Sequence, residues 1–205
     1  MLWPSLLILQ NDIIVMTIRG KQFKILQIIC LCLYYGIARW FPKSGPFFNI
    51  GGRFRRVLCR QIFKKCGKCI NVERGAIFGS GTEIEIGDYS GIGINANIPS
   101  NTIIGNYVMM GPNCIIFPHN HEFKDVETPM MFQGNTTKAL TVIGDDVWIG
   151  QNVMMTPGRH IAKGSIIAAG CVLSKNFPDY SVIGGNPSVL LKERKNDEKK
   201  NCGNI

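Results

Sequence analysis

Residues 86–116 read IGDYSGIGINANIPSNTIIGNYVMMGPNCII, and residues 143–173 read IGDDVWIGQNVMMTPGRHIAKGSIIAAGCVL. Stepping by six from the first residue of either stretch meets a large aliphatic side chain at every step. These residues are Ile86, Ile92, Ile98, Ile104, Met110 and Ile116, then Ile143, Ile149, Met155, Ile161, Ile167 and Leu173. A helical stripe repeats every three or four residues and a strand alternates every two, so neither explains this period. A short fixed period instead predicts a solenoid of parallel strands, in which each turn buries the aliphatic row of its neighbour.

The residue that follows each aliphatic position is usually very small. It is glycine or alanine at Gly87, Gly93, Gly105, Gly111, Gly144, Gly150, Ala162 and Ala168. We interpret the pattern as a triangular coil with faces of six residues, whose aliphatic side chains fill a bore between strands about 4.8 Å apart. These glycines are expected at corners with a positive φ angle, which costs little without a Cβ atom.

Charge is unevenly distributed along the 205 residues. Residues 13–72 hold twelve Lys or Arg and no Asp or Glu, although the net charge of the whole chain is only +9. Hydrophobic residues make up 45% of the chain, and there are 23 glycines, which predicts a globular, turn-rich domain. We expect no nucleic-acid partner.

The eight cysteines are interpreted as reduced thiols. Cys114 and Cys171 occupy small apolar positions of the repeat, which predicts burial. Cys66 and Cys69 form a single C-x-x-C without a second pair or a nearby histidine, so neither a zinc nor a redox site is favoured.

Two apolar runs, in residues 1–18 and 25–38, precede the repeat. Both are shorter than the roughly 20 residues that span a bilayer. Residues 25–60 are expected to be helical, and to lie on an anionic membrane face, to cap one end of the coil, or to do both. Translation from Met1 and from Met16 both remain open.

Three regions follow from these patterns. Residues 1–69 are expected to form a basic, apolar helical segment that includes a second helix over 53–68 ending at Gly67. Residues 70–177 would form the coil, interrupted by an inserted loop at 117–141 because 27 residues separate Ile116 from Ile143. Residues 178–205 would form a short closing helix over 189–195 and a frayed tail.

Five strings in order resemble the hexapeptide-repeat transferases. They are MGPNCIIFPHNHEF (110–123), PMMFQG (129–134), VIGDDVWIGQNV (142–153), IAAGCVLSK (167–175) and VIGGNPSVLLKER (182–194). The set is similar to the branch with maltose, galactoside and surface-polysaccharide O-acetyltransferases. The resemblance implies a left-handed parallel β-helix, a homotrimer and acetyl-CoA as cosubstrate.

In this family a histidine serves as general base on the acceptor hydroxyl. The resemblance places it at His121, eleven residues after Met110, with His119 as the second candidate. Imidazole suits this role because its pKa lies near neutral pH. The group that orients it stays open between the nearby acids Glu122 and Asp125 and a backbone carbonyl.

The resemblance also implies contacts with the coenzyme and the acceptor. Coenzyme contacts map to Gly150, Gln151, Ala169, Ser174 and Lys175, while a later basic contact falls on Val189 and shifts to Lys192 or Arg194. A backbone N–H near Gly150 is the expected oxyanion donor. Trp148 and Asn95 are the candidate acceptor contacts.

The sequence therefore predicts a cytoplasmic acetyl-CoA-dependent sugar O-acetyltransferase of surface-polysaccharide or lipid-linked glycan synthesis. Peripheral contact with the inner membrane face through residues 13–68 is expected from charge placement. We expect no resident metal. The alternatives are an N-acetyltransferase on an amino sugar, a γ-carbonic-anhydrase-like hydratase with a metal on His119, His121 and His160, and a non-catalytic coil. The acceptor and the hydroxyl acetylated stay open.

Overall fold

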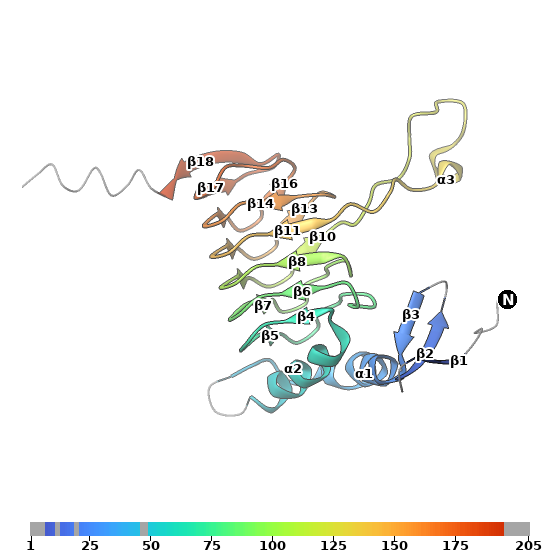
Figure 1. Cartoon of the computed structure of the whole chain (residues 1–205). Coiled ribbons are helices and arrows are strands. Elements are labelled where there is room, and N and C mark those ends of the chain that lie inside the picture. Colours follow the sequence, from blue (N-terminus) through green and yellow to red (C-terminus); the bar gives the residue numbers. More distant parts are fainter. Residues whose placement is uncertain (1–6, 11–12, 19–20, 46–48, 195–205) are drawn as a thin grey trace, which may run out of the picture.

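The computed structural model describes residues 7–10, 13–18, 21–45 and 49–194 (Figure 1). Met1, Cys202 and the tail from residue 195 lie outside these residues. The first elements are strands β1 (Leu7–Gln10), β2 (Ile13–Ile18) and β3 (Lys21–Lys24), paired antiparallel in that order. The expectation of a wholly helical front segment is therefore wrong here. The run IIVMTI of β2 is rich in β-branched residues, which favour strands.

Helices follow at α1 (Ile25–Gly36), the 3-10 turn η1 (Ala38–Trp40) and α2 (Ile50–Ile62). The prediction that the second helix continues to Gly67 is wrong. Lys65 and Cys66 form strand β4 instead, because this segment pairs with the next turn of the coil. The Lys65 N–H donates to the Ile84 carbonyl at 3.2 Å, and the Gly67 N–H donates to the Ile86 carbonyl at 2.8 Å. The coil thus begins before residue 70.

The coil has three faces of short parallel strands, which we name A, B and C. Face A holds β4 (Lys65–Cys66), β6 (Glu85–Ile86), β8 (Thr102–Ile104), β11 (Thr141–Ile143) and β14 (His160–Ile161). Face B holds β5 (Asn71–Val72), β7 (Gly91–Ile92), β9 (Met109–Met110), β12 (Trp148–Ile149), β15 (Ile166–Ile167) and β17 (Ser181–Gly184). Face C holds β10 (Ile115–Ile116), β13 (Met154–Met155) and β16 (Val172–Leu173), extended by bridges through Asn97 to Ile77.

The register explains the period of six. Ile86 pairs with Ile104, so one full turn is 104 − 86 = 18 residues and each face takes a third of it. The aliphatic rows point inward and are buried, except for Met110, which is partly buried against the same core. No described helix has the length and apolarity needed to pass through a membrane.

The glycines serve a different purpose from the one expected. Positive φ angles occur three residues after the aliphatic position, for example at Asn95, Asn113 and Asn152. The glycine directly after it is needed for close contact with the next turn. A Cβ on Gly93 would lie 2.1 Å from the backbone oxygen of Gly111.

The coil ends in a strand where a helix was expected. β18 (Val189–Glu193) runs antiparallel to β17, so the prediction of a closing helix over 189–195 is wrong. The turn between these strands, GNPS at residues 185–188, reverses the chain, and Val189 starts a run that pairs with the exposed edge of the last turn. The return strand therefore covers an edge that would otherwise be open to other chains.

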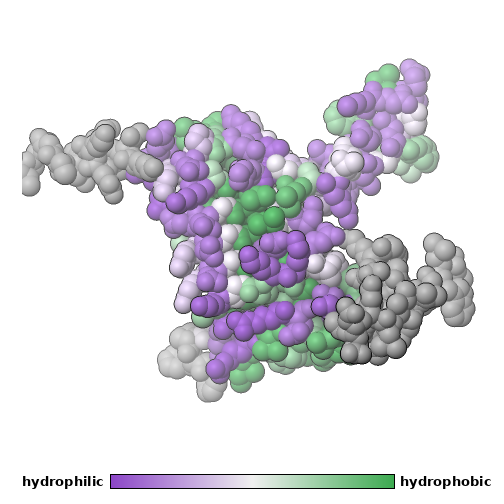
Figure 2. All heavy atoms as spheres, viewed as in Figure 1, coloured by the Kyte–Doolittle hydropathy of each residue, from purple (hydrophilic) through white to green (hydrophobic). Residues whose placement is uncertain are grey.

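The other end of the coil is closed by α1 and α2, which lie side by side beneath the first turn (Figure 1). The Tyr34 hydroxyl of α1 donates to the Ala76 carbonyl at 3.0 Å, and the aromatic rings of Tyr34 and Phe78 pack 4.6 Å apart. In Figure 2, hydrophobic residues also appear on the outer, lower margin of this end, over α1 and α2.

Candidate functional site

The insertion leaves the coil after β10 and returns at β11 as a two-stranded stem. The stem is held by backbone hydrogen bonds from Ala139 to Pro118 (2.9 Å), from Thr136 to Asn120 (2.9 Å) and from Glu122 to Gly134 (3.0 Å). His119 and His121 both lie on the outgoing strand, at the edge between faces C and A. The fold therefore brings both candidate histidines to one edge of the coil.

The two histidines differ in environment. His119 is half-buried, and among the described residues its enclosed Nδ1 has no hydrogen-bond partner. His121 is exposed and forms an isolated antiparallel bridge with Asn135. A partner to the enclosed nitrogen would fix the tautomer of the His119 ring, which is what a histidine base requires.

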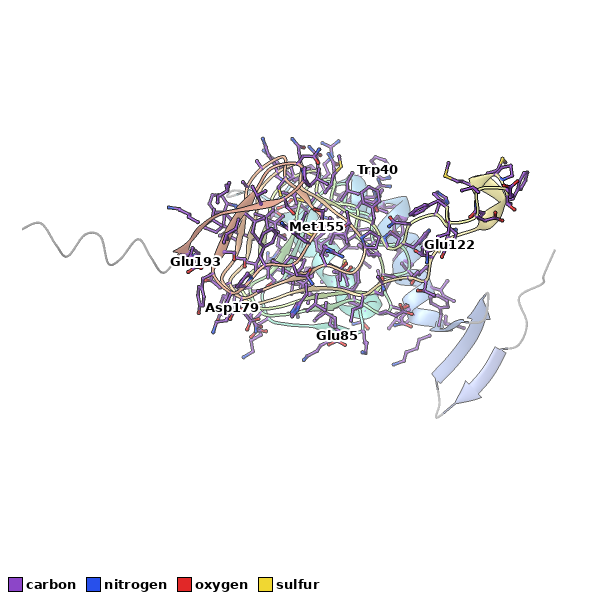
Figure 3. All side chains as sticks on the ribbon, turned by 90° about the horizontal axis from the view of Figure 1, so that it is seen from above. Trp40, Glu85, Glu122, Met155, Asp179 and Glu193 are labelled. Atoms are coloured by element: carbon purple, nitrogen blue, oxygen red, sulfur yellow. The ribbon has the colours of Figure 1, made fainter. Side chains whose placement is uncertain are left out.

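The stem ends in a tip containing α3 (Met130–Gln133). The tip is tied together by Gln133, whose side-chain amide donates to the carbonyls of Asp125 and Thr128, both at 2.7 Å. Hydrogen bonds from Thr128 and from the Glu127 backbone lower the pKa of the Asp125 carboxyl. Asp125 is thus engaged within the tip, which leaves Glu122 as the acid on the stem itself, well away from the coil axis marked by Met155 (Figure 3).

A groove lies on face C at the foot of the stem. Its volume is ≈ 510 Å³, which is within the range of small-molecule sites. Its walls are mostly apolar and include Ile115, Phe117 and Pro118, while Asn97, Asn101 and Lys138 add polar groups. Phe117 and Pro118 lead directly into His119, so the groove and the histidines share one stretch of chain.

Three of the expected coenzyme contacts lie on the edge between faces B and C. The N–H of Gly150, the expected oxyanion donor, donates to the Ile167 carbonyl at 2.8 Å. It is therefore already used in a hydrogen bond of the coil. Gln151 and Ala169 are exposed on successive turns, and within the described coil their N–H groups have no backbone acceptor. The free donors on this edge are therefore those of Gln151 and Ala169.

Ser174 and Lys175 lie on the other edge of face C, the one that carries the stem. The Ser174 N–H donates to the Ser188 hydroxyl at 3.0 Å, and the Lys175 ammonium lies 5.5 Å from the centre of the Phe177 ring. The expected contacts thus flank face C on both sides.

Sequence reasoning missed the part played by Arg159 on this edge. Its Nη1 donates to the Ser174 carbonyl at 2.7 Å, and its Nε and Nη2 donate to the Pro157 carbonyl at 3.2 and 3.0 Å. Arg159 therefore fixes the turn that presents Ser174 and Lys175. The only sequence signal for this contact was an arginine directly after the turn residues Pro157 and Gly158.

The remaining candidates are dispersed. Trp148 is exposed on face B beside Met109, and Lys192 is exposed on β18 opposite Val182. Arg194 donates to Asp146 (3.1 Å) and to the Gly164 carbonyl (2.6 Å).

Asn95 belongs to a ladder of asparagines along one corner. Its amide donates to Asn113 at 3.3 Å, and Asn113 donates to Asn152 at 3.1 Å. All three have positive φ angles, so the ladder satisfies the side chains of residues whose backbone the corner requires. The Asn95 amide group is thus already engaged within the protomer.

The thiols and the third histidine lie elsewhere. Burial raises the pKa of Cys66 to about 11, which disfavours the thiolate, and the seven described cysteines are all free. His160 lies on face A rather than on the stem, and the described residues contain no group of three His, Cys, Asp or Glu side chains placed to hold a metal.

Comparison with known proteins agrees with the fold and the site region. The model of the bacterial transferase hexapeptide family (six repeats) matches residues 140–175. The galactoside O-acetyltransferase of Lactococcus lactis is 31% identical over 146 residues, which is 68% of this chain and 67% of that protein. A probable macrolide acetyltransferase of Lysinibacillus sphaericus is 52% identical over 62 residues, 30% of this chain and only 34% of that protein.

A solved structure supports the same assignment along most of the chain. A hexapeptide-repeat-containing acetyltransferase from Vibrio cholerae, complexed with acetyl coenzyme A, superposes with a TM-score of 0.65 at 26% identity. The match covers 82% of this chain and 86% of that one. The chain therefore belongs to the hexapeptide-repeat acetyltransferases, an acyltransferase family with acetyl-CoA as cosubstrate.

Proposed function

We propose that this enzyme transfers the acetyl group of acetyl-CoA to a sugar hydroxyl, with a stem histidine as general base. The observation that carries the proposal is the continuity of the apolar groove on face C with the stem: Phe117 and Pro118 line the groove, and His119 and His121 follow them directly. The galactoside O-acetyltransferase of Lactococcus lactis acts on a sugar, which supports this acceptor class.

The chemistry needs a base because an alcohol is a poor nucleophile at neutral pH. A histidine that accepts the hydroxyl proton during attack on the thioester contributes roughly 10²–10⁴-fold to the rate. Its sequence position favours His121 as this base. The enclosed Nδ1 of His119 favours the other candidate, since a partner to that nitrogen would orient the ring.

We assign the acetyl-CoA contacts to the two edges of face C. Gln151 and Ala169 offer free N–H groups to the pantetheine arm on one edge, and the Gln151 N–H replaces that of Gly150 as the candidate oxyanion donor. Ser174 and Lys175 offer a hydroxyl and a cation on the other. Gly150 acts by packing, because a Cβ there would lie 2.5 Å from the Ala169 nitrogen.

We also propose that the coil is left-handed and that the chain forms a homotrimer, as the resemblance to the family implies. Met109 and Trp148 on face B and Met154 on face C are exposed on either side of the edge that carries Gln151. A neighbouring protomer packed there would cover this apolar surface and enclose the donor site. Trp148 would then form a wall of the site.

The proposed pathway is the synthesis of a surface polysaccharide or lipid-linked glycan at the inner face of the membrane. Support comes from the excess of basic residues over positions 13–68. Such an acceptor would be presented at an anionic surface, so an enzyme that rests on that surface would meet it by diffusion in two dimensions.

Release of the CoA thiol in the presence of a panel of sugars tests the assignment. His121→Ala and His119→Ala are compared with His160→Ala, which changes a histidine on face A. We expect one stem variant to lose 10²–10⁴-fold in kcat and the His160 variant to retain activity.

Four results would oppose the assignment. Wild-type activity in both stem variants would refute a stem base, and acetylation only of amino sugars would indicate N-transfer. Loss of activity in all three variants together with bound zinc in the purified protein would favour the metal hydratase. No thiol release with any acceptor would support a non-catalytic coil.

A further inference from the structure

We infer that the outward side of α1, together with a basic recess at its first turn, docks on an anionic phospholipid bilayer. The docking face consists of the apolar side chains Leu26, Ile29, Leu33, Ile37 and Trp40 and of the cations Lys24 and Arg60. It does not overlap face C. The inference rests on the membrane contact of the proposed function and names the residues that would make it, while its test does not depend on acetyl transfer.

Helix α1 is apolar on both sides, but only one side is covered by protein. Cys30, Tyr34 and Ala38 are buried against the end of the coil. The opposite side of α1 carries Leu26, Ile29 and Leu33 at helical spacing, which are 54%, 50% and 37% exposed. Ile37, at the end of the helix, and Trp40, in η1, follow them and are 49% and 59% exposed. Five large apolar residues exposed between positions 26 and 40 are unlike single exposed residues, and such groups mark interaction sites.

Cations lie where this patch begins. A recess of ≈ 370 Å³ is lined by Lys24, Leu26, Arg60 and Lys64, and none of its lining residues is acidic. Lys64 is paired with Glu85 at 2.6 Å, so Lys24 and Arg60 are the cations that the recess offers to a phosphate group. A lipid phosphate in the recess would leave its acyl chains beside Leu26, which is the arrangement that a bilayer requires.

The far end of the stripe has the residue type that favours a membrane interface. Trp40 is exposed, and the Arg39 guanidinium lies 4.7 Å from the centre of its ring. An indole ring combines a large apolar surface with a polar N–H and concentrates at the headgroup level of bilayers. The stripe thus has a cationic start and an aromatic end.

Charge complementarity selects the bilayer over a second copy of the chain. Residues 13–72 contain twelve basic and no acidic residues, so two such faces placed together would oppose cation to cation. An anionic lipid surface instead attracts each of these charges and accepts the apolar stripe below its headgroups.

Cosedimentation of the full chain with vesicles tests the inference without any use of enzymatic activity. We expect binding to vesicles of phosphatidylcholine with roughly 30–40% phosphatidylglycerol, because the anionic lipid gives a negative surface potential. Binding should be weaker in high salt, which screens that potential. Pure phosphatidylcholine should bind at least about tenfold less, because each Lys or Arg near an anionic surface contributes about fivefold in affinity.

Two double variants separate the apolar and the basic parts of the face. Leu26→Glu with Ile29→Glu should abolish binding, and Lys24→Glu with Arg60→Glu should reduce it at least about tenfold. Tyr89→Glu with Tyr107→Glu serves as the matched control, because these residues are 57% and 59% exposed, similar to Leu26 and Ile29, but lie on a corner of the coil. Unchanged thermal unfolding of each variant shows that the fold is intact.

Several outcomes would overturn the inference. They are wild-type binding in both double variants, equal binding to neutral and anionic vesicles, and no binding of the full chain to either. A dimer that dissociates in Leu26→Glu with Ile29→Glu, without vesicle binding by the wild type, would instead assign the stripe to a second copy.

Discussion

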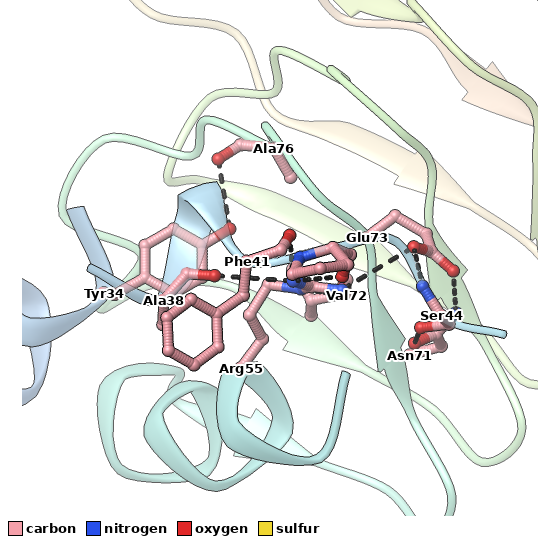
Figure 4. Close-up of polar contacts among 10 residues, drawn as sticks. Tyr34, Ala38, Phe41, Ser44, Arg55, Asn71, Val72, Glu73 and Ala76 are labelled. Atoms are coloured by element: carbon pink, nitrogen blue, oxygen red, sulfur yellow. Dashed lines mark hydrogen bonds and ion pairs between the residues drawn. The ribbon is translucent and has the colours of Figure 1, made fainter. Parts of the chain in front are cut away.

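Arg55 on α2 donates a hydrogen bond from Nε to the backbone carbonyl of Val72 on the first turn of the coil, at 2.6 Å (Figure 4). Its Nη1 donates to the carbonyls of Phe41 and Pro42 at 3.1 and 3.2 Å, and its Nη2 lies 3.7 Å from the Glu73 carboxylate. The side chain is fully buried. One guanidinium therefore joins the helical cap, the segment between the helices and the coil.

Arg55→Leu should destabilise the fold by about 3 kcal/mol, because the carbonyls of Val72, Ala38, Phe41 and Pro42 lose a donor and Glu73 loses its counter-charge. The measurement is the free energy of unfolding in urea. Arg53→Leu changes an exposed arginine two positions away in the same helix and should stay within about 0.5 kcal/mol of the wild type. Equal effects of the two substitutions would contradict a central role for Arg55.

Glu73 should make the stability of this cap depend on pH. Burial acts to raise the pKa of Glu73, but the Ser44 N–H at 3.1 Å, the Asn71 amide at 2.7 Å and the charge of Arg55 together lower it below its usual value of 4.5. A carboxyl with a lower pKa in the folded than in the unfolded state stabilises the fold at pH values above 4.5. That contribution is lost as the pH falls through the folded-state pKa.

Glu73→Gln should therefore cost about 1–3 kcal/mol at pH 7. The difference from the wild type should shrink as the pH falls below 4.5, when Glu73 itself becomes protonated. Urea unfolding at several pH values measures this difference. A gap that stays constant down to pH 2 would show that the carboxylate charge is not responsible.

Gly93 should tolerate no side chain, for a reason that differs from backbone freedom. A Cβ at Gly93 would lie 2.1 Å from the oxygen of Gly111, whereas one at Gly170 would meet nothing within 4 Å although Gly170 has a φ of +72°. Gly93→Ala should thus cost about 2 kcal/mol or more through overpacking.

Gly170→Asn is the matched control. It should cost less than about 1 kcal/mol, because asparagine adopts the left-handed region at the equivalent corners Asn113 and Asn152. Thermal unfolding compares the two variants. A larger loss at Gly170 than at Gly93 would show that φ, rather than space, limits the coil.

The coil itself could be predicted because its signal is local and repeated. Each inward aliphatic residue, from Ile86 to Leu173, recurs at the same interval, and the insertion was visible as the one break in that interval. The role of the glycines was mistaken, since a sequence does not distinguish a residue that is small for its φ angle from one that is small for its neighbour. Only the distance from Gly93 to the next turn separates the two.

The ends of the chain were harder to predict because they depend on what they pack against. VLLKE can form a helix or a strand, and the open edge of β17 selects the strand β18. The site shows the same division. His119 and His121 were recognisable as histidines in an insertion, whereas the engagement of the Gly150 N–H by Ile167 depends on a residue in the next turn.

Arg159 gives a prediction about the donor edge of the proposed site. Its guanidinium holds the carbonyls of both Pro157 and Ser174, so it joins two turns of the coil where Ser174 and Lys175 are presented. It acts as a positioning residue, since its Nε, Nη1 and Nη2 all donate to backbone carbonyls.

Arg159→Met should raise the KM for acetyl-CoA about five- to tenfold, with kcat within about twofold, because Ser174 and Lys175 lose their fixed orientation while the stem histidines keep theirs. Steady-state kinetics with varied acetyl-CoA measure both constants. Arg159→Lys should recover only part of the loss, because an ammonium does not reproduce the planar contact with two carbonyls. Lys163→Met, an exposed change on a different corner, should leave both constants unchanged. A fall in kcat with an unchanged KM would place Arg159 nearer to the reacting groups than to the donor.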